Sequence, residues 1–306
     1  MARQPIPAYA ILWSVLLLGQ LGCTDGSGDG GAGGAPSLAS QFPCQAVGSA
    51  AAGAGWGVFP GSPYAQSIIR QAAQIGGVTF PTGGVFEIPG MSNAYYLPAP
   101  HDAIAYDPIW LNQLNWTTGG GLEAGDSVLF HETGHMWAHK SGIAQCLGVG
   151  TTQSNWNHEY QADSYAGYIL RLLGGSAQPS VTVYTTVFGT WSPSHPPGTQ
   201  RAQVFVEAWT SVQPHNFCTQ SLLSVRSITI VEVLGPASDE ERVRELVEPA
   251  PIVLDDAQSR ALGNLLKLAL LRDRLTALGL NPYARESGPR FTQLCLEEGA
   301  PELLMQ

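Results

Sequence analysis

The sequence predicts an α+β fold, in which a small mixed or antiparallel sheet packs on a central helix and a helical region follows toward the C-terminus. Several segments carry apolar residues at helical spacing, whereas residues 78–97 are rich in β-branched and aromatic residues and are broken by Pro-Thr-Gly-Gly. Apolar residues make up 44 % of the 306-residue chain, which is enough to bury a sizeable core.

The expected elements can be placed in chain order. Residues 64–75 should form a helix that stops at Gly76 and Gly77, and residues 78–97 should form two or three strands before a turn at 98–102. The remaining expected elements are a strand at 103–106, a strand or extended loop at 181–188, and helices at 126–139, 157–173, 199–212, 240–246 and 257–278.

Residues 1–22 have the pattern of an export signal peptide, whose apolar core is too short to span a membrane. The Leu-Gly-Cys that ends at Cys23 resembles a bacterial lipobox, in which this cysteine is lipidated; the alternative is a plain signal peptide cleaved nearby. Residues 23–40 are mostly Gly, Ala, Ser and Asp and should form a flexible linker. We therefore expect an exported protein of the bacterial cell envelope, either an outer-membrane lipoprotein facing the periplasm or a secreted protein.

The charge balance bears on the class of partner. Charged residues make up 12 % of the chain and the net charge is −10, whereas an average globular protein has about 25 % charged residues. An acidic surface repels nucleic acid, so that class of partner is excluded. Contact with a membrane is expected only through a lipid on Cys23.

Cysteine usage predicts disulfides. Apart from Cys23 the chain contains Cys44, Cys146, Cys218 and Cys295. An even number in an oxidising compartment predicts two disulfides, with three connectivities open. The alternative is that some of these cysteines are buried thiols.

The strongest chemical signal is His131-Glu132-Thr133-Gly134-His135. Residues four apart share one face of a helix, so His131 and His135 can reach the same metal ion. Glu132 lies about 100° round the helix, where it can touch a metal-bound water without binding the metal. Bound zinc lowers the pKa of such a water to about 7. The alternative is two core histidines with an exposed glutamate between them.

A catalytic zinc needs a third protein ligand and an open position. His139 lies on the same face as the two histidines, but too far along the helix axis to be the third ligand. A longer motif that takes its third histidine from the same segment is excluded, because it would need a histidine where the chain has Ser141. Glu159 is the best candidate, because Glu159 and Asp163 are four apart on the apolar stripe of the next helix. A buried carboxylate is costly unless it is paired, so we expect Glu159 on the metal and Asp163 orienting a ligating histidine. The alternative is two carboxylates on a partly solvated helix end.

The third signal is His195-Pro196-Pro197 followed by Arg201. The prolines fix the backbone and place His195 just before a helix. Arg201 lies on the apolar stripe of that helix, and a guanidinium in that position needs an acidic partner, for which Asp163 or a substrate carbonyl region would serve.

These motifs in this order, with Glu-x-x-Ala-Asp at 159–163 and His-Pro-Pro-x-x-x-Arg at 195–201, resemble the M48 family of zinc peptidases and its small gluzincin relatives. The segments 93–94 and 104–107 also resemble the family's region before the catalytic helix. The likeness covers about residues 60–215. Many family members are embedded in a membrane, whereas no spanning helix beyond the signal is expected here.

The resemblance implies a zincin-like (gluzincin) peptidase domain at 41–217, followed by a helical region at 218–306 that inherits nothing from the family. It implies bound Zn²⁺ and places His195 and Arg201 close to the active site, where they steady the oxyanion or the substrate. The implied zinc ligands are His131, His135 and Glu159, with Glu132 as general base.

The function expected from these motifs is zinc-dependent endopeptidase activity on envelope or secreted proteins. A protein or peptide substrate would add as a strand to a sheet edge, for which Asn93, Ala94 and Tyr95 are candidates; the alternative is that this strand is an ordinary edge or interior strand. A second hypothesis is a catalytically weak gluzincin-like binding or assembly lipoprotein. A third makes the C-terminal helices an autoinhibitory or partner-docking module.

Overall fold

The computed structural model describes residues 57–117, 123–189, 192–218 and 254–304. All of them belong to one unit, Gly57–Gln306. Over this part of the chain the protein is α+β and mostly helical, with one four-stranded mixed sheet and nine α-helices, which confirms the expected fold class. No helix in these ranges is both long and apolar enough to cross a membrane.

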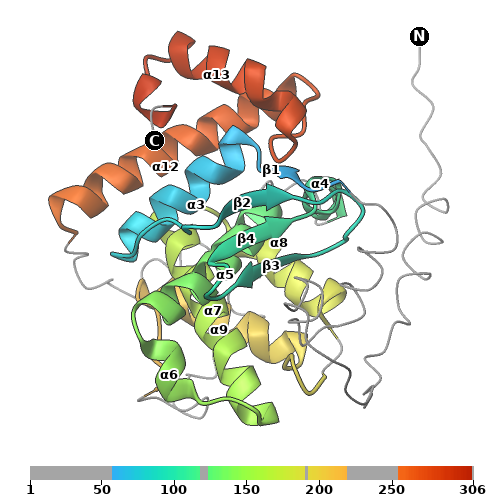
Figure 1. Ribbon diagram of the computed structural model, residues 1–306, viewed down its shortest axis with the longest axis vertical. Helices are drawn as coiled ribbons and strands as arrows, with labels where there is room; N and C mark the ends of the chain where they lie inside the picture. Colours follow the sequence, from blue (N-terminus) through green and yellow to red (C-terminus); the bar gives the residue numbers. More distant parts are fainter. Residues whose placement is uncertain (1–56, 118–122, 190–191, 219–253, 305–306) are drawn as a thin grey trace, which may run out of the picture. The chain divides into compact units, whose positions relative to one another are not determined.

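The sheet contains the strands expected within 78–97 and at 103–106, together with β1, which was not expected, in the order β1-β2-β4-β3. Its members are β1 (Phe59–Pro60), β2 (Gly84–Glu87), β3 (Ala94–Leu97) and β4 (Ala103–Tyr106). β2 and β4 are parallel, with Val85 opposite Ile104, while β3 runs antiparallel to β4, with Tyr95 opposite Ala105. β3 is therefore an edge strand, and one row of its backbone N–H and C=O groups faces away from β4 (Figure 1).

The helices that carry the sequence motifs are packed against one another. α5 (Glu123–Lys140) contacts both β3 and α7 (Thr152–Leu172), and α7 contacts α9 (Gly198–Ser211). α7 begins earlier than expected because Thr151 and Ser154 form a capping box at its start. The other helices before residue 218 are α3 (Pro63–Ile75), α4 (Pro108–Thr117), α6 (Ile143–Leu147) and α8 (Ala177–Thr182).

The expectation of a strand or extended loop at 181–188 is wrong. α8 continues directly into the π-helix η3 (Val183–Val187). The Val and Thr residues of this segment favour extended structure, but Ser176 caps α8 and the side chains of Val183 and Tyr184 are buried. Tertiary packing has overridden local propensity here.

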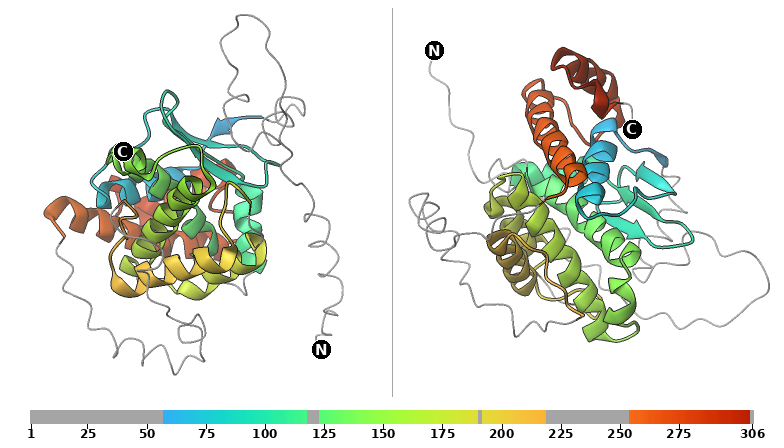
Figure 2. Two further views of the ribbon diagram at one scale, coloured as in Figure 1. Left: turned by 90° about the horizontal axis from the view of Figure 1, so that it is seen from below. Right: turned by 90° about the vertical axis from the view of Figure 1, so that its left-hand side faces the viewer.

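The C-terminal described residues form α12 (Asp256–Ala277), η5 (Arg285–Ser287), α13 (Gly288–Glu297) and η6 (Pro301–Leu303). α12 confirms the helix expected at 257–278, and it packs along α3 (Figures 1 and 2). The helix expected at 240–246 lies outside the described residues, as do the signal peptide, the linker and Cys23. The domain boundary between residues 217 and 218 stays a prediction.

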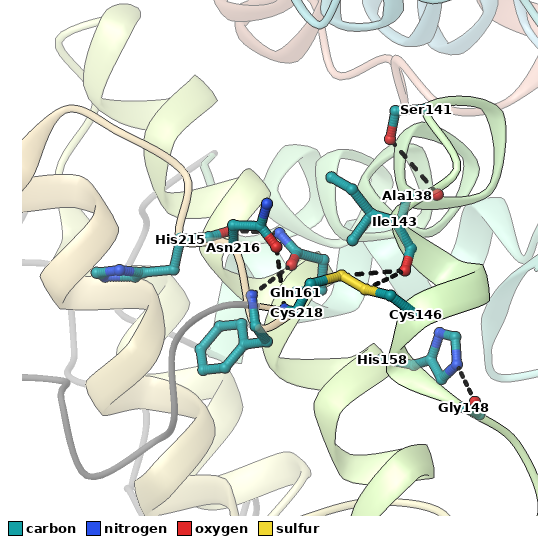
Figure 3. The surroundings of a disulfide bond; sticks show 11 residues. Ala138, Ser141, Ile143, Cys146, Gly148, His158, Gln161, His215, Asn216 and Cys218 are labelled. Carbon is teal, nitrogen blue, oxygen red and sulfur yellow. Dashed lines mark hydrogen bonds between the residues drawn. A yellow bond between two sulfur atoms is a disulfide. The ribbon is translucent and has the colours of Figure 1, made fainter.

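One disulfide joins Cys146 in α6 to Cys218, which follows α9 (Figure 3). Cys295 of α13 is a free thiol, and its side chain is fully buried in the hydrophobic core. The prediction of a second disulfide is therefore wrong for Cys295, which is a buried apolar residue, and Cys44 lies outside the described residues.

Candidate metal centre

Three side chains from α5 and α7 converge. His131, His135 and Glu159 each offer one ligand atom, and these atoms all lie within 4.8 Å of one another. His131 Nε2 is 3.5 Å from Glu159 Oε2, and His135 Nε2 is 3.4 Å from Glu159 Oε1. The two histidines reach the same point because they are one helical turn apart. The three residues predicted as metal ligands are thus brought together.

The close approach of α7 to α5 depends on Gly134, which stands between the two histidines. A Cβ atom at this position would lie 2.8 Å from Ala162 Cα and 2.9 Å from the Ala162 carbonyl oxygen. A side chain at position 134 would therefore push α7 and Glu159 away from the histidines. The metal-binding motif accepts any residue at position 134, but the packing of α7 on α5 requires glycine there.

Asp163 and Arg201 lie behind the cluster. Asp163 Oδ1 is 2.8 Å from His131 Nδ1, and Asp163 also accepts two hydrogen bonds from Arg201, Nε to Oδ2 and Nη2 to Oδ1, each 2.9 Å. The acidic partner of Arg201 is thus Asp163, one of the two alternatives. Because Asp163 occupies Nδ1, the Nε2 atom of His131 is the one that faces Glu159.

The electrostatics of the cluster favour ionised carboxylates. Burial raises the pKa of Glu159, but His195 and Arg201 outweigh it and hold the pKa well below its usual value. Burial lowers the pKa of His131, but Asp163 and Glu159 raise it to about 10. A metal ion can bind Nε2 only when that nitrogen carries no proton, so metal binding and proton release are linked.

The chemistry of these residues fits a divalent metal ion. Glu159 Oε2 is buried and lies 3.2 Å from Arg201 Nη2, yet it makes no well-formed hydrogen bond to any described residue. Two imidazole nitrogens and one carboxylate, with a carboxylate behind one imidazole, are a ligand set typical of catalytic zinc. The cluster could thus hold a metal ion; zinc itself is proposed below.

Glu132 is buried beside the cluster and faces the sheet edge. Its Oε2 accepts a hydrogen bond of 2.7 Å from the backbone N–H of Tyr96 in β3. That N–H points away from β4, so the outward edge of β3 runs alongside the predicted base. The Tyr96 hydroxyl donates to Asp102 at 3.0 Å, and its ring lies 5.7 Å from that of His139. Tyr96 thus fixes the position of the strand along α5.

His195 lies at the exposed side of the cluster. Its Nε2 is 3.8 Å from Glu159 Oε1, and 42 % of its side chain is exposed. Its Nδ1 is hydrogen-bonded to Ser194 Oγ at 2.9 Å, which orients Nε2 toward the site. His195 is therefore close enough to contact a molecule bound at the cluster.

The predicted substrate residues lie on the edge strand or next to it. Ala94 and Tyr95 are in β3, and Asn93 precedes it with its carbonyl accepting from Asp107 N–H at 2.9 Å. Asp107, part of the likeness to the family, has a structural role, because its Oδ1 accepts from Ile109 N–H at the start of α4. Sequence reasoning missed Tyr96, Gly134 and Ser194, although strand alternation and proximity to the motifs were signals for them.

Comparisons with protein-family models, with curated proteins and with solved structures gave no match to this chain. The resemblance to the M48 family stays an interpretation of the motifs. The structure adds a buried His-His-Glu cluster that is compatible with a zincin.

Proposed function

We propose that this protein is a zinc-dependent endopeptidase of the gluzincin type. One observation carries the proposal: His131, His135 and Glu159 converge within 4.8 Å, and Glu132 lies between this cluster and the outward edge of β3. A metal site, a carboxylate base and an outward-facing strand edge together suit metal-assisted hydrolysis of an extended peptide.

Each residue has a role in this proposal. His131, His135 and Glu159 would hold the ion, which when bound supplies a Lewis acid and lowers the pKa of a water ligand to about 7. Glu132 takes a proton from the attacking water as its oxygen bonds to the scissile carbonyl carbon. When the C–N bond breaks, Glu132 gives this proton to the leaving amine. His195 donates from Nε2 to the oxyanion.

The edge strand supports a peptide or protein as the substrate. An extended peptide can pair with the outward N–H and C=O groups of β3, at Ala94 and Tyr96, and so lie across the site. Asn93 precedes β3, and Tyr95 lies between the two outward-facing residues. The N–H of Tyr96 now holds Glu132, so a paired substrate would release the carboxylate next to the scissile bond.

The cellular setting remains part of the proposal. The signal pattern at 1–22 and the lipobox at Cys23 support export to the bacterial envelope, and the Cys146–Cys218 disulfide is consistent with an oxidising compartment. Envelope or secreted proteins would then be the substrates.

The decisive test compares Glu132→Gln with Glu123→Gln, a matched change in the first turn of the same helix. We expect Glu132→Gln to lower kcat/KM on an unfolded protein by about 10²–10⁴-fold while zinc content is kept, and Glu123→Gln to change neither. Glu159→Ala should lose zinc. Cleavage by Glu132→Gln at the wild-type rate would exclude the mechanism; zinc binding without cleavage by the wild type would favour the binding or assembly lipoprotein.

A further inference from the structure

The π-helix η3 lies against the first turn of α9, which carries Arg201. Gly198 makes this contact possible, because a Cβ atom there would overlap the carbonyl oxygen of Tyr184. π-helical turns are rare and occur frequently at functional sites. The close packing of η3 on α9 therefore suggests that η3 does more than connect two helices.

The aromatic residues of this segment face Arg201. The guanidinium carbon of Arg201 lies 5.1 Å from the centre of the Tyr184 ring and 5.2 Å from that of Phe188. Tyr184 is 2 % exposed, and its hydroxyl makes no well-formed hydrogen bond within the described ranges. A cation near a ring face is attracted more strongly when both are withdrawn from water. The two rings thus pack against the same guanidinium that Asp163 and Glu159 contact.

The position of Arg201 matters because two carboxylates compete for it. Arg201 Nη2 is 2.9 Å from Asp163 Oδ1 and 3.2 Å from Glu159 Oε2. A small rotation of the guanidinium would strengthen its contact with Glu159. Since Glu159 offers the same oxygen atoms to the metal, such a rotation would weaken metal binding.

We propose that Tyr184 and Phe188 are positioning residues of the metal centre, which hold Arg201 on Asp163 and so keep Glu159 available to the ion. The inference rests on the proposed metal-binding function. It assigns to the π-helix a role that none of the three sequence motifs predicted. Both rings contact Arg201, so the expected effect passes through Arg201.

The test measures the Kd for Zn²⁺ by competition with a chromophoric chelator in Tyr184→Leu, Tyr184→Phe and Phe188→Leu. Phe291→Leu is the matched control, because Phe291 is a fully buried aromatic residue of α13. We expect Tyr184→Leu and Phe188→Leu to raise the Kd by about 10-fold. Tyr184→Phe keeps the ring face and should remain within about twofold of wild type, and Phe291→Leu should lower the Tm without changing the Kd.

A second readout separates positioning from general destabilisation. The visible spectrum of the Co²⁺-substituted protein reports ligand geometry, and it should change in Tyr184→Leu and Phe188→Leu but not in Phe291→Leu. Wild-type Kd and spectrum in both leucine variants would overturn the proposal, as would equal Kd losses in Phe291→Leu. If the wild type binds zinc but does not hydrolyse peptides, the peptidase proposal fails and the positioning role stands or falls on the Kd values. A wild type that binds no zinc refutes both.

Discussion

At the scale of single residues, the side chains at the candidate metal centre are oriented by contacts on their far sides. His131 has Asp163 on Nδ1, His195 has Ser194 on Nδ1, and Glu132 accepts the N–H of Tyr96. Such outer contacts fix the tautomer and the direction of a side chain before a ligand binds.

Asp163→Asn should weaken this arrangement. The amide cannot balance the buried charge of Arg201 or favour the same tautomer of His131, and the freed guanidinium would turn to Glu159. We expect the Kd for Zn²⁺ to rise by about 10–100-fold. Chelator competition measures it, without denaturant and at a pH where the variant is folded. An unchanged Kd would show that Asp163 serves packing alone.

Asp102 makes a pH-dependent contribution to stability away from the metal. It pairs with Lys140 at 3.0 Å and accepts from Thr82 N–H at 2.7 Å and from the Tyr96 hydroxyl. Burial raises the pKa of Asp102, but these donors outweigh it and hold the pKa below its usual value. The stabilisation is therefore complete above the unfolded-state pKa of about 3.9 and is lost as pH falls through the lower folded-state pKa.

Asp102→Asn should lower the free energy of unfolding by about 1–3 kcal/mol at neutral pH. Asn also tolerates the left-handed backbone at this position, where φ is 44°. Urea unfolding of both proteins should show the difference shrinking below about pH 4. A difference that is constant with pH would point to lost packing, and an unchanged Kd for Zn²⁺ would provide the control for Asp163→Asn.

The residues of the site could be predicted where chemistry restricts the side chain. Two histidines one turn apart can bind the same metal ion, and Glu159, Asp163 and Arg201 lie on otherwise apolar stripes, where charges need partners. Tyr184 and Phe188 could not be found in this way, since an aromatic residue in an apolar segment is ordinary core.

At the scale of elements, the site depends on how closely α5 and α7 approach. The sequence predicted both helices, but not the contact of Gly134 with Ala162 that sets their separation. Spacing along one helix says which residues share a face, whereas the distance to the next helix depends on small residues of both. The π-helix η3 was missed for a related reason, because its Val and Thr residues favour strands until packing decides otherwise.

Gly134→Ala tests this separation. The added methyl group must displace Ala162 or Tyr165, and overpacking of this kind destabilises by about 1–3 kcal/mol and should raise the Kd for Zn²⁺. Gly263→Ala on α12 is the control, because a Cβ there meets nothing within 4 Å and should stabilise by up to about 1 kcal/mol. Urea unfolding and chelator competition measure both quantities. Equal stability and equal Kd in Gly134→Ala and wild type would show that Gly134 does not set the separation of α5 and α7.

At the scale of the whole unit, the C-terminal helices are joined to the helix that carries the histidines. Arg272 of α12 pairs with Asp126 of α5 at 2.5 Å, and the hydroxyls of Tyr64 and Tyr283 donate to the same carboxylate. The sequence predicted α12 as a helix, but gave no sign of this partner, because charges so far apart in sequence meet only through the packing of α12 on α3.

Arg272→Met should therefore affect the metal centre. Arg272 is 7 % exposed, and removing one member of a buried ion pair costs about 3–5 kcal/mol because the remaining charge is left uncompensated. Arg274→Met is the control on the same helix, since Arg274 is 44 % exposed where it pairs with glutamates and such pairs contribute about 0–1 kcal/mol.

Unfolding of these variants, followed by far-UV circular dichroism and by the visible absorption of bound Co²⁺, should show one coincident transition in each protein, at lower denaturant in Arg272→Met. A cooperative unit is expected because Asp126 lies in α5, the helix that carries His131 and His135, so loss of α12 would remove its ion-pair partner Arg272. Two separate transitions, with the candidate metal centre outlasting the C-terminal helices, would instead favour an independent module that docks on the rest of the unit.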